Sequence, residues 1–433
     1  MDVFQIVAVL ITLTAVFSYV NHRLLKLPST IGLMLIAMAS SLTLFALGGQ
    51  HPEFQREATA FLSRIDFNKT LMQGMLGVLL FASALHVNLG DLKQHRITIG
   101  VLATVGVVLS TVLVSYLTYF LFSFLGIEVR LIYCFLFGAL ISPTDPIAVL
   151  GILKHVGAPK DLETKFAGEA LFNDGVAVVL FLGLLQMATG ERGFEPMHLT
   201  AMFLQEAVGG VLYGLVIGWV ALLMLRKIDE YKIEVLISLA VALGGYALAA
   251  KLHVSGPIAM VVAGLFIGNE SRAGAMSEVT RAHLDTFWEL IDEILNALLF
   301  VLIGLELLVV RVSMPHVIIG TLAWVLVVLS RFAAVAIPLR FLGGRRVFPE
   351  GTTKVLTWGG LRGGVSVALA LSIPAFVDGE AVRERDMVLA VTYVVVILSI
   401  VIQGLSIGRM LKRTFPRKDE GRADEGTPRV EAR

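Results

Sequence analysis

Long apolar stretches, separated by short polar ones, run through almost the whole chain. A helix needs about 20 predominantly apolar residues to cross the hydrocarbon core of a bilayer. By this measure the pattern predicts an all-α, polytopic membrane protein. The thirteen predicted spans lie near residues 3–21, 28–48, 70–90, 97–125, 130–152, 165–188, 203–225, 233–250, 255–269, 286–309, 315–339, 355–376 and 387–411.

Two further stretches differ from the spans. Residues 52–69 carry mixed charge and are expected at the membrane interface, and residues 412–433 are charged and poor in apolar residues, which predicts a disordered basic tail. Lys and Arg indicate the orientation, because cytoplasmic loops carry an excess of them. One set of alternate loops holds about twenty-one of these residues and the other about nine. The N-terminus is therefore expected outside and the C-terminus in the cytoplasm.

Composition agrees with a membrane protein. Hydrophobic residues make up 56% of the chain and charged residues 16%, whereas soluble domains carry about 25% charged residues. The net charge of +1 gives no sign of a nucleic-acid partner, and Cys134, the single cysteine, excludes a disulfide within the chain. No zinc-ligand spacing and no phosphate-binding loop are found, so we expect no ATPase activity and no cofactor.

Two carboxylates lie deep within predicted spans. Asp145 stands in Ser142-Pro143-Thr144-Asp145-Pro146, and Asp174 follows Asn173. A charge at that depth is expensive and usually marks an ion or proton path. The two prolines interrupt the helix, and broken backbone is tolerated at membrane depth only inside protein or beside a wet cavity. These features together indicate an ion transporter.

A second interruption is predicted in the twelfth span. Its sequence, Gly359-Gly360-Leu361-Arg362-Gly363-Gly364, places four glycines around one arginine, and each glycine weakens a helix by about 1 kcal/mol relative to alanine. Spans five and twelve run in opposite directions, which is typical of an inverted-repeat transporter with a midplane site. The alternative is that the glycines merely permit close helix packing.

The residues around the first interruption suggest how ions bind. Asp174 can hold a proton or a cation but not both, which suffices for exchange, and Asn173 adds an amide oxygen beside it. Thr144 offers a hydroxyl and a carbonyl. Asp145 either binds the ion or, the reading we favour, balances the positive ends of two half-helices. Arg362 would balance the negative, carbonyl ends of half-helices. The alternative to an ion-binding Asp174 is a structural Asp174 that is only hydrogen-bonded.

Two other buried charges need partners, because an isolated buried ion is costly. Glu169 lies in the sixth span and Arg331 in the eleventh. Few other deep charges exist, so we expect Glu169 and Arg331 to pair, with Arg362 as the competing partner of Glu169.

One face at the start of the tenth span is acidic, since four polar residues recur there at helical spacing. We interpret it either as a cytoplasmic funnel that concentrates cations or as a solvated helix end, and its acids could also pair with Arg362. The four residues are Glu289, Asp292, Glu293 and Asn296.

These motifs, in this order and spacing, resemble the monovalent cation/proton antiporters of the sodium/proton exchanger type, including bacterial NhaP-like members. The resemblance covers roughly residues 3–411. It implies thirteen helices, alternate binding of cation and proton at Asp174, and a buried ion pair at Glu169 and Arg331. Its Asn-Asp pair, here Asn173 and Asp174, implies electroneutral one-for-one exchange.

The resemblance also implies a homodimer in a bacterial plasma membrane, in which a core moves against a dimerisation domain. The core helices would lie near 70–188 and 286–411, and the dimerisation helices mainly near 3–48 and 203–269. The substrates would be protons and a monovalent cation: sodium first, potassium or lithium otherwise. Relatives often carry an acid where this chain has Ala82 and a serine where it has Ala170, so two potential oxygen ligands are missing.

Two other functions fit the sequence less well. One is a cation channel, but two opposed broken helices with a single titratable carboxylate suit alternating access better, and no repeated filter sequence is found. An intramembrane aspartyl protease would use Asp145 and Asp174 as a dyad, but the chain lacks the Gly-x-Gly-Asp sequence of such enzymes and gives Asn173 no role. Coupling of proton flux to a cation gradient distinguishes an exchanger from both.

Overall fold

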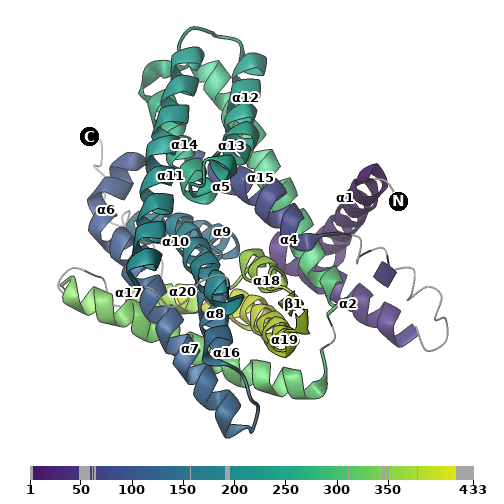
Figure 1. The fold of residues 1–433 in the computed structure, drawn as a ribbon. Coiled ribbons are helices and arrows are strands. Elements are labelled where there is room, and N and C mark those ends of the chain that lie inside the picture. The colour runs from purple at the N-terminus through teal and green to yellow at the C-terminus, as the bar shows by residue number, and fades with distance from the viewer. Residues whose placement is uncertain are drawn as a thin grey trace, which may run out of the picture.

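The computed structural model describes residues 3–47, 59, 60, 62, 65–156, 158–190, 196–310, 312–343, 348, 351–377 and 379–415. Helices occur at each of the thirteen predicted ranges (Figure 1). The first six segments are α1 (Val3–Val20) with η1 (Asn21–Leu25), α2 (Ser29–Leu47), α4 (Phe67–Lys69) with η2 (Thr70–Met75) and α5 (Leu76–Leu85), α6 (Leu89–Val101) with η3 (Leu102–Gly106) and α7 (Val107–Phe124), α8 (Leu131–Ile141) with α9 (Ile147–Val156), and α10 (Lys160–Ala188).

The remaining segments complete the helical bundle. They are α11 (Pro196–Leu225), α12 (Tyr231–Leu239) with η4 (Ala240–Gly245) and α13 (Tyr246–Lys251), α14 (Gly256–Glu270) with η5 (Ser271–Ala275), α15 (Glu278–Glu306), α16 (Met314–Phe341), α17 (Thr352–Trp358) with α18 (Gly364–Leu371), and α19 (Arg383–Leu398) with η7 (Ser399–Gln403) and α20 (Gly404–Thr414). A short antiparallel hairpin, β1 (Phe376–Val377) and β2 (Glu380–Ala381), joins α18 to α19.

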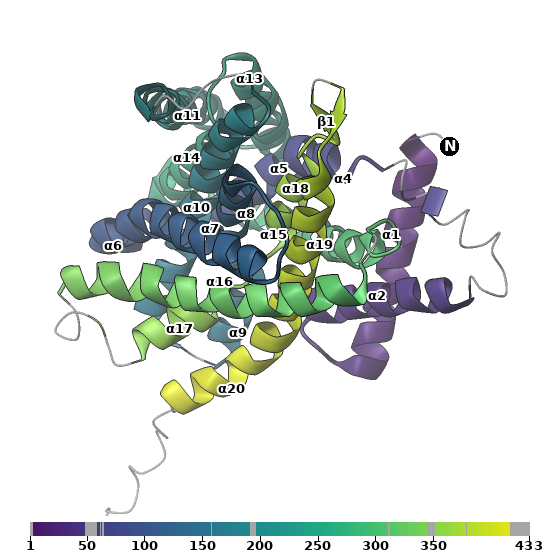
Figure 2. The same cartoon turned by 60° about the horizontal axis from the view of Figure 1, so that its bottom comes forward.

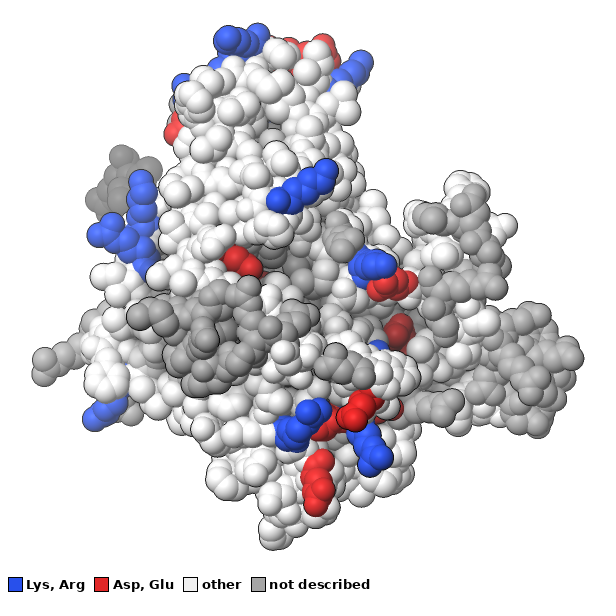
Figure 3. Space-filling model, viewed as in Figure 1, with Lys and Arg blue, Asp and Glu red and all other residues white. Residues whose placement is uncertain are grey.

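Length and hydropathy identify the bundle as membrane-spanning. Within the described ranges, eight helical segments are long and apolar enough to cross a bilayer, and two shorter apolar helices, Leu131–Ile141 and Gly256–Glu270, accompany them. Charged side chains are sparse on the face in Figure 3, where most of the described surface is uncharged. The predicted fold class, an all-α polytopic membrane protein, is therefore confirmed.

Two predictions concern segments that are only partly described. Most of 52–69, including 52–58, falls outside the described residues, so its interfacial position stays a prediction. α20 continues to Thr414, and residues 416–433 of the predicted tail also fall outside.

The helices pack in two groups around α10. α5 and α11 both pack on α14, with α12 and α13 beside them at the top of Figure 1. Small residues permit this close approach: a Cβ added to Gly264 of α14 would lie 2.6 Å from the Phe81 carbonyl of α5, and one added to Gly214 of α11 would lie 2.5 Å from the Ala259 carbonyl of α14. α15 packs on α2 and on α5.

The second group surrounds the two interrupted helices. α7 packs on α8 and α16, α16 packs on α19, and α18 packs on α19 (Figure 2). α20 packs on α9. The sequence assigned spans three and ten to the moving core, and in the structure these spans, α5 and α15, pack mainly on α14, α2 and each other. The division into core and dimerisation domains stays a prediction.

Candidate ion-binding site at two crossed helix breaks

The two predicted interruptions meet each other in space. α8 ends at Ile141 and α9 begins at Ile147, and α17 ends at Trp358 while α18 begins at Gly364. The two links run antiparallel, and the Asp145 N–H donates to the Leu361 carbonyl over 2.8 Å. Pro143 and Pro146 prevent the first link from being helical. A backbone bridge therefore fixes the crossing, as the predicted fold of two crossed broken helices requires.

Arg362 lies at the carbonyl end of α8. Its side chain is buried, at 1% exposure. Nη1 donates to the Ser142 carbonyl over 2.6 Å and to the Pro143 carbonyl over 2.9 Å. These carbonyls follow the last turn of α8, where the helix dipole is negative. The guanidinium thus lies at the carbonyl end of a half-helix, as the sequence predicted. It hydrogen-bonds to backbone carbonyls and not to Glu169 or the acids of α15, which were the alternative partners.

Asp145 lies at the opposite, positive ends of two half-helices. It is half-buried, two residues before α9, and its carboxylate packs against Gly363, the residue that precedes α18. A Cβ on Gly363 would overlap that carboxylate. Glycine at this position therefore lets the link approach Asp145.

Asn173 joins the unbroken helix α10 to the first link. Its Nδ2 donates to Thr144 Oγ1 over 2.8 Å, and both side chains are buried. Asn173 Oδ1 is buried and has no hydrogen-bond partner among the described residues. Asp174, the next residue, is 9% exposed and interacts electrostatically with Asp145. The four predicted ion-binding residues, Thr144, Asp145, Asn173 and Asp174, therefore form one cluster.

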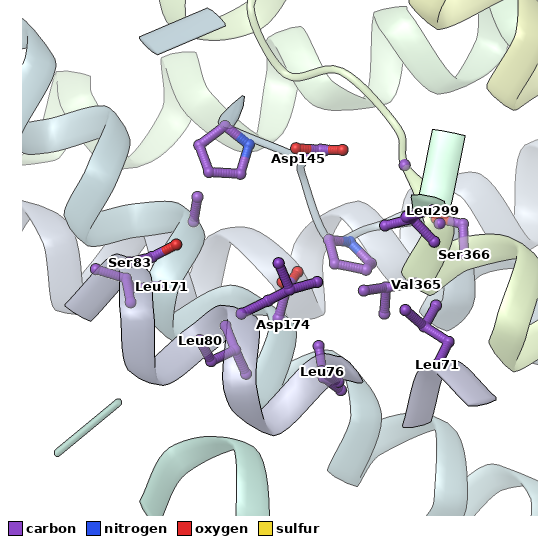
Figure 4. Close-up of a pocket in the computed structure, with 16 residues that line it drawn as sticks. Leu71, Leu76, Leu80, Ser83, Asp145, Leu171, Asp174, Leu299, Val365 and Ser366 are labelled. Atoms are coloured by element: carbon purple, nitrogen blue, oxygen red, sulfur yellow. The ribbon is translucent and has the colours of Figure 1, made fainter. Parts of the chain in front are cut away.

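A narrow cavity, part of it open to the exterior, lies beside this cluster. Figure 4 shows Asp174 between Asp145 and the leucines of η2 and α5. Its polar lining includes two serines that the sequence argument missed, Ser83 of α5 and Ser366 of α18, on opposite sides of the view. The other lining residues are Leu71, Leu76, Leu79, Leu80, Pro143, Pro146, Ala170, Leu171, Leu299, Gly363, Gly364 and Val365.

Only weak features of the sequence indicate that Ser83 and Ser366 line the cavity. Ser366 comes directly after Gly363-Gly364-Val365, and Ser83 directly after Ala82, where an acid had been noted as absent. Ser366 is 1% exposed, and its Oγ has no hydrogen-bond partner in the described part of the chain. Ser83 is half-buried. The positions of both depend on how the helices rotate about their axes, which short motifs do not specify.

Glu169 and Arg331 form a buried ion pair between α10 and α16. Arg331 Nη1 and Glu169 Oε1 are 2.5 Å apart, and the side chains are 3% and 1% exposed. Arg331 Nη2 also donates to the Leu356 carbonyl of α17 over 3.4 Å. Glu169 lies more than one helical turn before Asp174 along α10. The ion pair is therefore next to the site but does not line the cavity.

The acidic row of α15 runs from an exposed to a buried position. Glu289 and Glu293 are exposed, Asp292 is half-buried, and Asn296 is 3% exposed. The Asn296 side chain interacts with that of Asp292, one helical turn earlier. Leu299, three residues later, lines the cavity. The row therefore leads toward the site.

Comparisons with known proteins bear on this geometry. Residues 9–413 match the model of the family described as sodium/hydrogen exchanger, transmembrane. The chain belongs to the sodium/hydrogen exchanger family. It is 51% identical over 420 residues to the Na(+)/H(+) antiporter NhaP of Pseudomonas aeruginosa, an alignment that covers 95% of this chain and 97% of the relative. It is 36% identical over 399 residues to the Na(+)/H(+) antiporter NhaH of Halobacillus aidingensis, covering 90% and 93%.

A solved exchanger shares the fold. The structure of the sodium proton antiporter MjNhaP1 from Methanocaldococcus jannaschii at pH 8 superposes with a TM-score of 0.74 at 17% identity, over 96% of this chain and 99% of that one. The family is a family of transporters, so the enzyme alternative, an aspartyl protease, is set aside. The chain is an integral membrane protein, as predicted.

Proposed function

We propose that this sodium/hydrogen exchanger moves sodium ions and protons in opposite directions through the cavity, with Asp174 carrying the two ions in turn. One observation supports this most directly: Asp174, on an unbroken helix, lines a cavity beside two crossed helix breaks. The names of the relatives in Pseudomonas and Halobacillus agree with sodium as the cation.

The cation site would be built from oxygens of four segments: α10, the link between α8 and α9, α18 and α5. Hard monovalent cations take oxygen ligands, and the cluster offers the Asp174 carboxylate, Asn173 Oδ1 and the oxygens of Thr144. Ser366 Oγ is buried without a partner among the described residues, so a bound cation would satisfy it, and Ser83 adds a hydroxyl from α5. These two serines would stand in for the ligands missing at Ala82 and Ala170.

Asp145 would act mainly through charge. Its carboxylate lies at the start of α9 and against the residue before α18, where two positive half-helix ends meet. Arg362 supplies the opposite charge at the carbonyl end of α8. This arrangement supports a compensating role for Asp145, with a direct contact to the cation as the alternative.

Exchange would be electroneutral and proceed by alternating access. One carboxylate, Asp174, is shared between one cation and one proton, while Glu169 stays paired with Arg331 and adds no second proton. The acidic row of α15 would concentrate cations at the cytoplasmic entrance. The protein would act as a homodimer in a bacterial plasma membrane, with its N-terminus outside and its C-terminus in the cytoplasm.

Replacement of Asp174 by asparagine tests the carrier. In proteoliposomes loaded with a pH-sensitive dye, Asp174→Asn should abolish sodium-driven proton movement, because no group then binds both ions. Asp161→Asn, on the same helix but with a side chain 70% exposed, should leave exchange intact and is the matched control. Near-normal exchange by a folded Asp174→Asn protein would contradict the assignment, and sodium flux without coupled proton flux in the wild type would indicate the channel alternative.

A further inference from the structure

The link between α17 and α18 leaves main-chain groups that its own helices do not pair. The last carbonyls of a helix lack partners within it, and Trp358 is the last residue of α17. Arg362 lies in the non-helical link, so its N–H is also outside any helical ladder. Each such group costs several kcal/mol if it stays unpaired in a membrane interior. Something outside the link must therefore pair them.

Two side chains of η7, on the neighbouring transmembrane segment, do so. Gln403 Nε2 donates to the Trp358 carbonyl over 3.1 Å, before the link. Ser399 Oγ accepts from the Arg362 N–H over 3.1 Å, near the far end of the link. Ser399 Oγ in turn donates to Gln403 Oε1 over 2.7 Å. The two side chains thus form one unit that spans the break.

The unit is itself held from a third helix. Trp324 of α16 donates from Nε1 to Gln403 Oε1 over 3.2 Å. Ser399 and Gln403 are 0% and 2% exposed, so these hydrogen bonds are shielded from bulk solvent. The segment that carries them is π-helical, a conformation found often at functional sites. The Gln403 and Ser399 side chains are therefore held in place by their own helix and by α16 as well as by the link.

The link, once fixed, sets the position of the ion site. The Leu361 carbonyl accepts from the Asp145 N–H over 2.8 Å. The Arg362 guanidinium holds the carbonyls of Ser142 and Pro143. A displacement of residues 359–363 therefore displaces the link that carries Thr144 and Asp145.

We propose that Gln403 and Ser399 are positioning residues for ion exchange: as a hydrogen-bonded pair they bridge the α17–α18 break and thereby hold Thr144 and Asp145 in register with Asp174. The proposal rests on the ion-binding role given above to those three residues. It assigns a function to the thirteenth span, which contributes no residue to the lining of the cavity.

Gln403→Leu tests the pair, since leucine is of similar size and removes all three hydrogen bonds of the Gln403 side chain, to the Trp358 carbonyl, Ser399 Oγ and Trp324 Nε1. It should raise the sodium concentration for half-maximal exchange in proteoliposomes about ten-fold, a change equivalent to about 1.4 kcal/mol, while the maximal rate stays within about two-fold of wild type. Thr392→Val is the matched control: Thr392 is equally buried on α19, and its hydroxyl donates to Val388 of its own helix. That control should leave the half-saturating concentration unchanged.

A second variant keeps the test decisive if Gln403→Leu does not fold. Ser399→Ala creates almost no cavity and removes the acceptor of the Arg362 N–H, so it should shift half-saturation in the same direction. Combined with Gln403→Leu, it should add little, because the two residues act as one unit.

Several outcomes would overturn the proposal. One is a lowered melting temperature with unchanged half-saturation in both variants, which would reduce the pair to a structural role. Another is an equal shift in Thr392→Val. Survival of exchange in Asp174→Asn would instead remove the site on which the proposal depends, so the two failures are distinguishable.

Discussion

Glu169 and Arg331 offer a quantitative test of the packing behind the ion site. Their side chains are 1% and 3% exposed, with 2.5 Å between Oε1 and Nη1. Removal of one member of such a buried pair leaves an unpaired charge and costs about 3–5 kcal/mol, whereas removal of both can be nearly neutral. Glu169→Gln and Arg331→Met should therefore each destabilise the protein by about that amount, and the double variant should be far less destabilised than their sum.

The assay is a double-mutant cycle on detergent-solubilised protein, read as the free energy of unfolding in denaturant. Arg226 and Glu270 provide the control pair, because their contact of 2.9 Å joins side chains that are 52% and 38% exposed. Exposed pairs of this kind contribute about 0–1 kcal/mol, so the control cycle should show little coupling. Additivity of the Glu169 and Arg331 variants to within about 0.5 kcal/mol would refute the buried pair.

Three further expectations follow from the site. Because Asp174 is shared by one sodium ion and one proton, exchange in proteoliposomes with a valinomycin-clamped potential should not change with voltage. If a net charge did cross, the potential would change the free energy of transport by about 2.3 kcal/mol per charge per 100 mV. A steep voltage dependence would therefore mean a second titrating group. The sodium concentration for half-maximal exchange should rise as pH falls, because protons compete for Asp174, and a flat pH series would contradict that competition. Gly363→Ala should lower exchange by at least ten-fold, since the added Cβ would overlap the Asp145 carboxylate. Gly100→Ala, at an exposed position of α6 with open space around the glycine, should retain transport and is the control for glycine replacement.

The sequence predicts the helices well where the bilayer dictates their composition. All thirteen apolar stretches became helical segments, and both interruptions fell where proline or clustered glycine requires them. Boundaries were less accurate where a helix extends beyond the apolar stretch. α15 begins at Glu278 rather than near 286, because its first turns carry charged residues such as Glu278, Arg281 and Asp285, which keep the hydropathy of that stretch low.

The candidate site was predictable in its charges but not in its hydroxyl groups. Asp174, Glu169 and Arg331 are conspicuous because a charge in an apolar helix needs a reason. Ser83 and Ser366 are ordinary in a membrane sequence, and only the rotation of α5 and α18 brings them to the cavity. The role of Gln403 was equally hidden, because it depends on contacts with residues 45 and 79 positions away.

Because a backbone bridge joins Asp145 to Leu361, the crossing of the helix breaks and the choice of cation ligands are two properties that evolution can alter independently. The bridge uses an N–H and a carbonyl, groups that almost any residue supplies, so this contact does not itself depend on the side chains that bind the cation. Ala82 and Ala170 illustrate this freedom, because the crossing forms although neither residue supplies a side-chain oxygen. A lineage can therefore exchange one set of cation ligands for another, and retune which ion is carried, without rebuilding the architecture that carries it.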